Sequence, residues 1–311
     1  MTKIGIDNIS EIKLNVITYE RRYDSDGDLA IHPAIREVYD KKGYTLAPKS
    51  PEEAKERGVK HWNGLATSIP RISVYRDHPD SEAIVAADIA PTRYLIGQAL
   101  RDIIKEKPDL AVEKMTAMNP RIANVSLIAP IKVGNRYHLL SQIKGKALDS
   151  GMIHAALVAG GVEEKHLHTA NPLISALKTE CTEELGIDLS YFESTSHAFM
   201  MDEPEYGYVN FASIARNTKL DEVLNAYEAD SKRKLSKEQL EVMALSFIPI
   251  AGLALTPLEK GNLENLICYH PTPDGLKESK ETRKTIAYTE IMVEHLRDTK
   301  NLRFVLERAG F

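Results

Sequence analysis

The chain has 311 residues, enough for more than one domain of typical size, and 43% hydrophobic and 27% charged residues are ordinary for a globular protein. The formal net charge of −5 argues against binding nucleic acids through a general basic surface, and two cysteines are too few for a disulfide scaffold. No apolar run reaches membrane-spanning length and no signal peptide is visible, so we expect a cytoplasmic protein without membrane partners.

Residues 1–120 show strand and helix patterns but no recognised motif. Segments 12–19 and 69–75 favour strands, and the charged segment 48–57 favours a short helix. An apolar stripe at helical spacing predicts a helix over residues 91–107. We interpret this region as an N-terminal α+β extension of unknown role. A nucleic-acid module in the extension is a further hypothesis, although its basic residues are interleaved with acidic ones.

The next region, residues 121–255, alternates short apolar strands with turns around one central helix. A turn is expected at Gly134-Asn135, and a charged helix over residues 221–242. These patterns predict a mixed α/β domain. The expected strands cover residues 122–131, 137–141, 155–159, 194–201, 208–215 and 245–250.

The remaining residues, 256–311, are interpreted as a C-terminal helical segment. Thr256-Pro257 is expected to follow the last strand of the central domain, and residues 277–309 have a helical apolar pattern. Its apolar positions and those of helix 91–107 need a covering surface. We therefore expect both to pack on the central domain or across the interface of a homodimer.

Local signals define the central helix sharply. Asn171 is a favourable N-cap residue, Pro172 suits the first helical position, and Gly186 supplies a left-handed stop. These residues predict a helix over 172–185. His166 and His168 in the preceding loop are interpreted as solvated side chains rather than metal ligands.

Three glutamates gather at the C-terminal end of this predicted helix. Glu180 and Glu184 are one turn apart on one face, and Glu183 lies beside them. Carboxylates at this spacing repel each other, and the helix dipole adds to that penalty. A divalent cation would reverse the penalty, because carboxylate oxygens are preferred ligands of Mg²⁺ and Mn²⁺. The alternative is a solvated acidic face.

The segment Glu180–Ile187 resembles the second half of the Nudix box, which reads Arg-Glu-apolar-any-Glu-Glu-any-Gly-apolar. Gly161, followed by two acidic residues, provides the start of the box if the loop 165–170 carries about four extra residues, which surface loops tolerate. Cys181 occupies the motif's apolar position, so we expect it to be buried. Thr179 stands where the family has Arg.

The resemblance implies an α/β fold, a Nudix α/β/α sandwich with a mixed sheet formed by residues 121–255. It also implies a pyrophosphohydrolase that cleaves a nucleoside diphosphate linked to another moiety with the help of Mg²⁺ or Mn²⁺. Metal ligation is expected from Glu180, Glu183 and Glu184, of which Glu180 and Glu183 also count as catalytic.

The resemblance implies that Gly160 and Gly161 present backbone groups near the metal. Apart from the resemblance, Lys144 could meet substrate phosphates as a point charge, the alternative being a basic surface turn. The general base is expected among Asp202, Glu203 and Glu205, with Glu203 as the catalytic candidate.

The absence of the motif arginine leaves two functions open. The first is an active hydrolase of a nucleotide-like small molecule. The alternative is a catalytically weak or inactive Nudix-fold protein that senses nucleotides or acts as a scaffold. The loss of a side chain that positions a metal ligand typically weakens metal binding or activity by roughly 10–100-fold, and Thr179 cannot replace a guanidinium.

Overall fold

The computed structural model describes residues 5–17, 33–57, 63–79, 81–106, 121–144, 151–192, 195–203, 207–240, 250–258, 265–272 and 274–311. The chain forms two compact units that are not continuous in sequence. The first contains Met1–Val125, Gly161–Ala176 and Phe199–Phe211, and the second contains Ser126–Gly160, Leu177–Ala198 and Ala212–Phe311. These divisions differ from the expected boundaries at 121 and 256, which stay a prediction.

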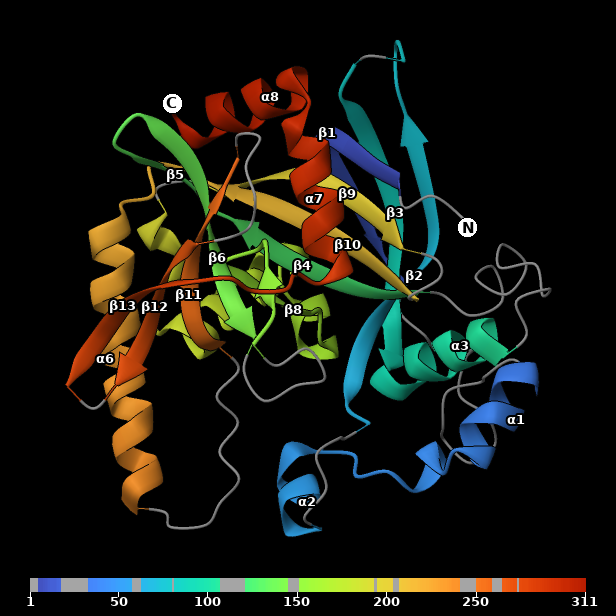
Figure 1. The fold of residues 1–311 in the computed structure, drawn as a ribbon. Coiled ribbons are helices and arrows are strands. Elements are labelled where there is room, and N and C mark those ends of the chain that lie inside the picture. The colour runs from blue at the N-terminus through green and yellow to red at the C-terminus, as the bar shows by residue number, and fades with distance from the viewer. Residues whose placement is uncertain are drawn as a thin grey trace. The chain divides into compact units, whose positions relative to one another are not determined.

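Long strands dominate the first unit (Figure 1). Strand β1 runs parallel to β3, whereas β1–β9, β2–β3 and β2–β4 are antiparallel, which confirms the predicted α/β class with a mixed sheet. The sheet has seven strands in the order β10-β9-β1-β3-β2-β4-β8, with β8 (Val158–Gly161) at one end, and β10 also pairs with β4. The strands are β1 (Gly5–Val16), β2 (Leu65–Tyr75), β3 (Ala83–Arg93), β4 (Arg121–Ile128), β9 (Thr195–Glu203) and β10 (Tyr208–Ala215).

Helix α3 (Tyr94–Glu106) corresponds to the helix predicted over 91–107, but it begins three residues later because Pro91–Arg93 complete strand β3. Its apolar stripe packs against α1 (Pro33–Lys41), a helix that the sequence reading did not identify. The two helices lie side by side (Figure 1) and share a cluster that includes Ile35, Leu95 and Leu100. The stripe that motivated the homodimer is therefore covered within the first unit, and the homodimer itself stays a prediction.

The first unit also contains three short helical elements. The segment predicted over 48–57 forms α2 (Pro51–Glu56), and η1 (Tyr44–Leu46) precedes it. The loop expected to carry extra residues forms the 3₁₀ helix η2 (Glu164–His168).

The second unit contains an antiparallel sheet in the order β13-β12-β11-β6-β5, with β7 paired to β6. Gly134 has a φ of 59° at the predicted turn between β5 and β6. Buried side chains on this sheet include Ile143, Ala254 and Leu266. The strands are β5 (Pro130–Val133), β6 (Arg136–Lys144), β7 (Ile153–His154), β11 (Ile250–Pro257), β12 (Leu266–Thr272) and β13 (Gly275–Glu281).

The C-terminal segment is only partly helical, which corrects the sequence reading. Thr256-Pro257 belong to β11 instead of following it, and residues 277–281 lie in β13. Helices α7 (Ala287–Arg297) and α8 (Thr299–Ala309) follow, and the charged helix predicted over 221–242 is α6 (Leu220–Leu240). The prediction failed at β12 and β13 because their alternation of apolar and polar residues is irregular.

Several predicted strands are confirmed with small shifts. The segment 122–131 is split between β4 and β5, and 155–159 becomes strand only from Val158, at the start of β8 (Val158–Gly161). The strand expected over 245–250 lies outside the described residues except for Ile250. Among the described residues, no helix has the length and apolar character needed to cross a membrane.

Candidate functional site

Helix α5 (Pro172–Glu180) begins where its capping signals predict. The Oδ1 atom of Asn171 accepts a hydrogen bond from the backbone N–H of Ile174 at 3.1 Å. Pro172 is the first helical residue, where its missing N–H removes no helical bond. Local sequence alone therefore sets the start of the element that carries the glutamates.

The end of the helix differs from the prediction. After Glu180 the chain widens into one π-helical turn, η3 (Cys181–Leu185), instead of continuing as α-helix to residue 185. Gly186 then ends the turn in the predicted left-handed conformation, with a φ of 70°. A π turn closes its hydrogen bonds over five residues instead of four, so successive side chains are separated by a smaller angle about the axis. The glutamates of this turn therefore do not follow α-helical spacing.

Two of the three glutamates lie against consecutive residues of β8. The carboxylate of Glu180 occupies the space above Gly160, and a Cβ atom at residue 160 would overlap it. The Oε2 atom of Glu184 accepts a hydrogen bond from the backbone N–H of Ala159 at 3.2 Å, and Glu184 is only 7% exposed. The structure thus holds two carboxylates next to the Ala159-Gly160 backbone.

Glu183 differs from the other two glutamates in its exposure. Its side chain is exposed, whereas Glu180 is half-buried and Glu184 is buried. Within the described residues, the three carboxylates do not all approach one another within 4.8 Å. A role for Glu183 as a direct ligand would require its side chain to move, so that role stays a prediction.

Cys181 is fully buried, as its place in the motif predicts. Burial raises the pKa of its thiol, and the negative charges of Glu184 and Glu180 raise it further. The thiol therefore stays protonated and is no nucleophile.

The sequence reading missed one further acidic residue near this turn. Asp230 of α6 is 6% exposed, and a Cβ atom at Gly186 would lie 2.5 Å from the Asp230 Cβ and 2.9 Å from its Oδ1. Gly186 therefore gives α6 room to approach η3. No sequence pattern distinguishes Asp230 from the other charged residues of this helix.

No guanidinium is available from the motif position, because residue 179 is threonine. The neighbouring Lys178 is exposed and forms an ion pair with Asp188, with 3.4 Å between Nζ and Oδ2. Lys178 is therefore engaged away from the helix face that carries Glu180 and Glu184. Adjacent helical residues point in different directions, so Lys178 does not take the place of a side chain at residue 179.

Lys144 is the last residue of β6, and its backbone closes a hairpin with Met152 and Gly151. Its positive charge adds to burial in lowering the pKa of His154 well below the usual value. His154 in turn stacks on Tyr288, with ring centroids 4.5 Å apart. Gly161 follows Gly160 at the end of β8, and a Cβ atom there would make only an ordinary contact with Asn124.

Two of the general-base candidates, Asp202 and Glu203, belong to the end of β9 in the first unit. Asp202 forms an ion pair with Arg121, whose side chain is 12% exposed, so its carboxylate serves a structural contact. Glu203 is the last residue of β9, but its side chain and all of Glu205 lie outside the described residues. The assignment of Glu203 stays a prediction.

His166 is buried, at 3% exposure, which corrects the expectation that it is solvated. Its Nδ1 atom lies 3.0 Å from the hydroxyl of Ser175, and burial lowers its pKa. His168 is exposed, as expected. The two histidines of η2 therefore differ in exposure, one buried and one exposed.

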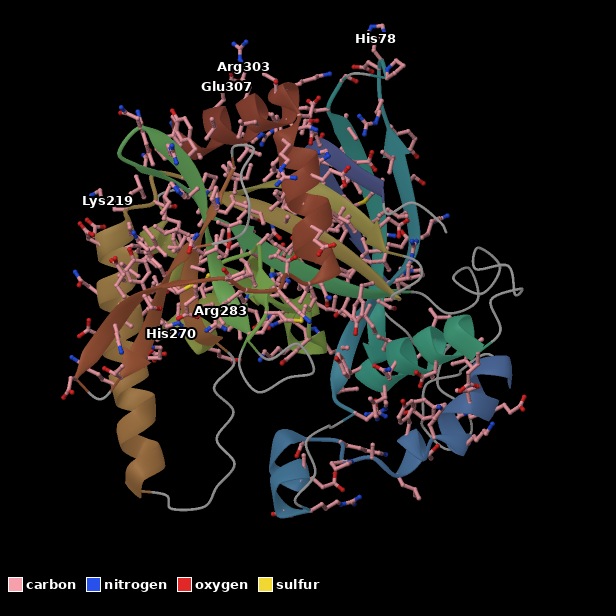
Figure 2. The ribbon with its side chains drawn as sticks, in the orientation of Figure 1. His78, Lys219, His270, Arg283, Arg303 and Glu307 are labelled. Atoms are coloured by element: carbon pink, nitrogen blue, oxygen red, sulfur yellow. The ribbon has the colours of Figure 1, made fainter. Side chains whose placement is uncertain are left out.

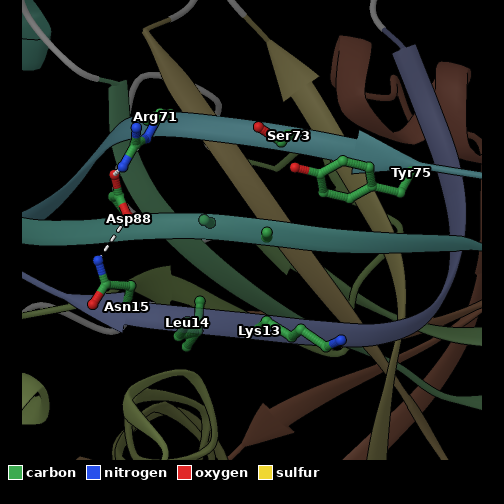
Figure 3. A pocket seen from close by; sticks show the side chains of 9 residues that line it. Lys13, Leu14, Asn15, Arg71, Ser73, Tyr75 and Asp88 are labelled. Carbon is green, nitrogen blue, oxygen red and sulfur yellow. Dashed lines mark hydrogen bonds and ion pairs between the residues drawn. The ribbon is translucent and has the colours of Figure 1, made fainter.

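A pocket of about 310 Å³ lies in the first unit, away from any motif (Figure 3). Asp88 at its edge accepts hydrogen bonds from Asn15 at 2.9 Å and from Arg71 Nε at 2.7 Å. These contacts hold the pKa of Asp88 below its usual value. Asp88 and Arg71 form an ion pair with each other, so we propose no reaction for this pocket. Its lining side chains include Lys13, Asn15, Arg71, Ser73, Tyr75 and Asp88.

The chain was compared with known proteins by sequence and by structure. The sequence matches no family model and no curated protein. Among solved structures, the chain is similar to a MutT/nudix family protein from Enterococcus faecalis. The two are 10% identical over 67% of this chain and 79% of the other, with a TM-score of 0.32. The Nudix resemblance of this chain is therefore one of sequence motif.

Proposed function

We propose that this protein is a metal-dependent hydrolase that cleaves the diphosphate bond of a nucleoside diphosphate linked to another moiety. The observation that carries the proposal is the placement of Glu180 and Glu184 against Ala159 and Gly160. Two carboxylates lie next to one short strand, one above Gly160 and the other bonded to the Ala159 N–H. This is the part of the Nudix motif that binds metal.

The donor set fits Mg²⁺ or Mn²⁺. Both cations prefer carboxylate oxygens, and Mg²⁺ is usually held by one or two carboxylates together with substrate phosphates. Glu180 and Glu184 would hold the cation, and Glu183 would contribute through a bridging water. A bound cation neutralises charge on the phosphoryl oxygens and makes water a better nucleophile.

Each residue of the chain has a distinct part in this proposal. Glu184 is fixed by the Ala159 N–H, so its second oxygen keeps a constant position. Glu180 depends on the absence of a side chain at residue 160. Lys144 is the candidate for binding phosphate, and Glu203 the candidate for the general base. The expected substrate is a nucleotide-like small molecule, and the expected assembly is a homodimer.

One observation favours a second function, a nucleotide sensor or scaffold with little or no turnover. Thr179 supplies no guanidinium, and Lys178 pairs with Asp188 instead. A site that binds metal and nucleotide but positions its ligands loosely would bind without rapid hydrolysis.

A panel of linked nucleoside diphosphates distinguishes the two functions. The intact protein is incubated with each compound and Mg²⁺, and release of monophosphate is measured together with binding by calorimetry. Hydrolysis that disappears in Glu180→Gln and Glu184→Gln supports the enzyme. Mg²⁺-dependent binding without product supports the sensor, and neither binding nor product would contradict both. Glu307→Gln is the matched control, because this exposed glutamate pairs with Arg303 on α8 (Figure 2).

A further inference from the structure

A second group of possible metal ligands lies on β12 and β13 of the second unit. Cys268, His270 and Glu281 each offer one ligand atom, and these three atoms all lie within 4.8 Å of one another. Cys268 and His270 are two residues apart on β12, so they share one face of the sheet. Ser279 pairs with Cys268 across the strands, and Glu281 lies two residues further along β13 on that same face.

Glu281 is oriented by contacts to both of its oxygens. Oε1 accepts a hydrogen bond from Ser279 and lies 2.7 Å from His270 Nε2. Oε2 accepts a hydrogen bond from Arg283 Nε at 2.7 Å, and Arg283 also donates to the Gly151 carbonyl at 2.8 Å. These contacts lower the pKa of Glu281 to about 2. The carboxylate is therefore charged and turned so that one oxygen faces the imidazole.

The imidazole of His270 packs against the neighbouring strand, β11. A Cβ atom at Gly252 of β11 would lie 2.9 Å from His270 Nδ1 and 2.7 Å from the Tyr269 carbonyl oxygen. The ring therefore lies over β11 at the one point where that strand has no side chain to block it. Figure 2 labels His270 and Arg283 in this part of the second unit.

Cys268 is the buried member of the group. It is fully buried in a cluster with Ile143, Ile153, Ala254 and Leu266. The side chains of His270 and Glu281 are about one-quarter exposed, at 25% and 27%. The group is thus bordered by apolar side chains at Cys268 and is accessible to solvent at His270 and Glu281, so an ion can reach it.

We propose that Cys268, His270 and Glu281 form a binding site for Zn²⁺. Thiolate, imidazole and carboxylate are the three ligand types that zinc takes in proteins, whereas Mg²⁺ takes oxygen ligands. Three protein ligands leave a fourth position for water. Arg283 is a positioning residue that holds the far oxygen of Glu281, as outer hydrogen bonds commonly hold metal-binding carboxylates.

Charge balance is compatible with this site. The cation would be opposed by Arg283 but compensated by the Glu281 carboxylate and the Cys268 thiolate. Burial raises the pKa of Cys268, the charge of Glu281 raises it further, and Arg283 opposes that rise. Zinc binding requires the thiol to lose its proton.

Cobalt substitution in the full-length protein tests the proposal. Metal is removed with a chelator, Co²⁺ is added, and bound cobalt is measured by mass spectrometry and by absorption. We expect about one Co²⁺ with a thiolate-to-cobalt charge-transfer band, displaced by Zn²⁺. Cys181→Ser should keep the band and Cys268→Ser should lose it, because only Cys268 lies in the group.

Two further variants protect the test against misfolding of Cys268→Ser. His270→Gln and Glu281→Gln alter half-buried side chains, and their fold is checked by circular dichroism. Each should weaken cobalt binding by more than about 100-fold, beyond the loss typical of an outer residue. The proposal is overturned if the wild-type protein shows no thiolate band with excess Co²⁺, or if the band survives in folded His270→Gln and Glu281→Gln.

Discussion

Two regions of the second unit, the η3 turn and the strands β12 and β13, position polar side chains in the same way. In the first, Glu180 extends over Gly160 of β8, and in the second, His270 lies over Gly252 of β11. In both regions a neighbouring strand lacks a side chain at the point of approach. The resulting donor sets differ, because the first offers carboxylate oxygens and the second offers sulfur, nitrogen and oxygen.

This difference shows that donor chemistry, and not shared geometry, should decide which cation each region binds. Oxygen ligands suit Mg²⁺ and Mn²⁺, whereas a thiolate with an imidazole suits Zn²⁺. The two regions should therefore respond independently to variants and to metals.

The largest expected effect is on turnover in Glu184→Gln. The amide can still accept the hydrogen bond from Ala159, so the fold should persist while one ligand charge disappears. We expect Mg²⁺-dependent hydrolysis to fall by more than about 100-fold, beyond the loss caused by an outer residue. Steady-state rates measure this, with Glu307→Gln as control. Unchanged turnover at saturating Mg²⁺ would remove Glu184 from the site.

A smaller effect is expected when the two glycines are replaced. Gly160→Ala collides only with the tip of Glu180, so activity should fall by roughly 10–100-fold with little change in stability. In Gly252→Ala, the added Cβ atom would lie 2.7 Å from the Tyr269 carbonyl oxygen. The backbone must therefore shift, and the stability of the fold should fall. Activity assays with thermal unfolding separate the two. Equal losses of stability would show that the glycines do not play these different parts.

Acid should weaken the fold by a moderate amount through buried histidines. Burial lowers the pKa values of His154, His166 and His197, the last to about 4. Between the unfolded value of about 6.5 and the lowered folded value, only the unfolded chain binds these protons, so stability falls as pH falls. Each histidine contributes a slope of up to about 1.4 kcal/mol per pH unit. Denaturant titrations from neutral pH to about pH 4 give the free energy of unfolding as a function of pH. Its slope should be smaller in His197→Gln, and an unchanged slope would contradict the role of His197 in acid sensitivity.

The smallest effect concerns helix capping. Asn171→Ala removes the cap of α5, and Asp298→Ala removes the cap of α8, where Oδ1 accepts from the Lys300 and Asn301 N–H groups. Each should cost about 1 kcal/mol of stability. Because α5 carries Glu180, only Asn171→Ala should also reduce turnover. Equal activity in the two capping variants would show that the helix start does not position the glutamates.

Sequence signals predicted the elements whose cause is local. Asn171, Pro172 and Gly186 defined the ends of the glutamate segment, and the turn at Gly134 and strand β10 were also found. The π turn was not predictable, because no residue between Cys181 and Leu185 distinguishes it from an α-helical turn. The π turn therefore gives the glutamates a different spacing from the α-helical one that the sequence reading assumed.

The cysteine group was missed for a different reason. Cys268 and Glu281 come together only through the register of β12 with β13, and residues 277–309 have an apolar spacing that also suits a helix. Register depends on long-range packing, which a single sequence does not reveal. The sequence reading also missed α1, which covers α3. Charged residues lie between the apolar residues of this short helix.

Manganese binding measured by electron paramagnetic resonance tests the central claim most directly. The intact protein is titrated with Mn²⁺, alongside the double variant Glu180→Gln/Glu184→Gln and the variant His270→Gln. We predict a bound Mn²⁺ in the wild-type protein and in His270→Gln, and its loss in the double variant. Mn²⁺ binding by the double variant with wild-type affinity would contradict the account.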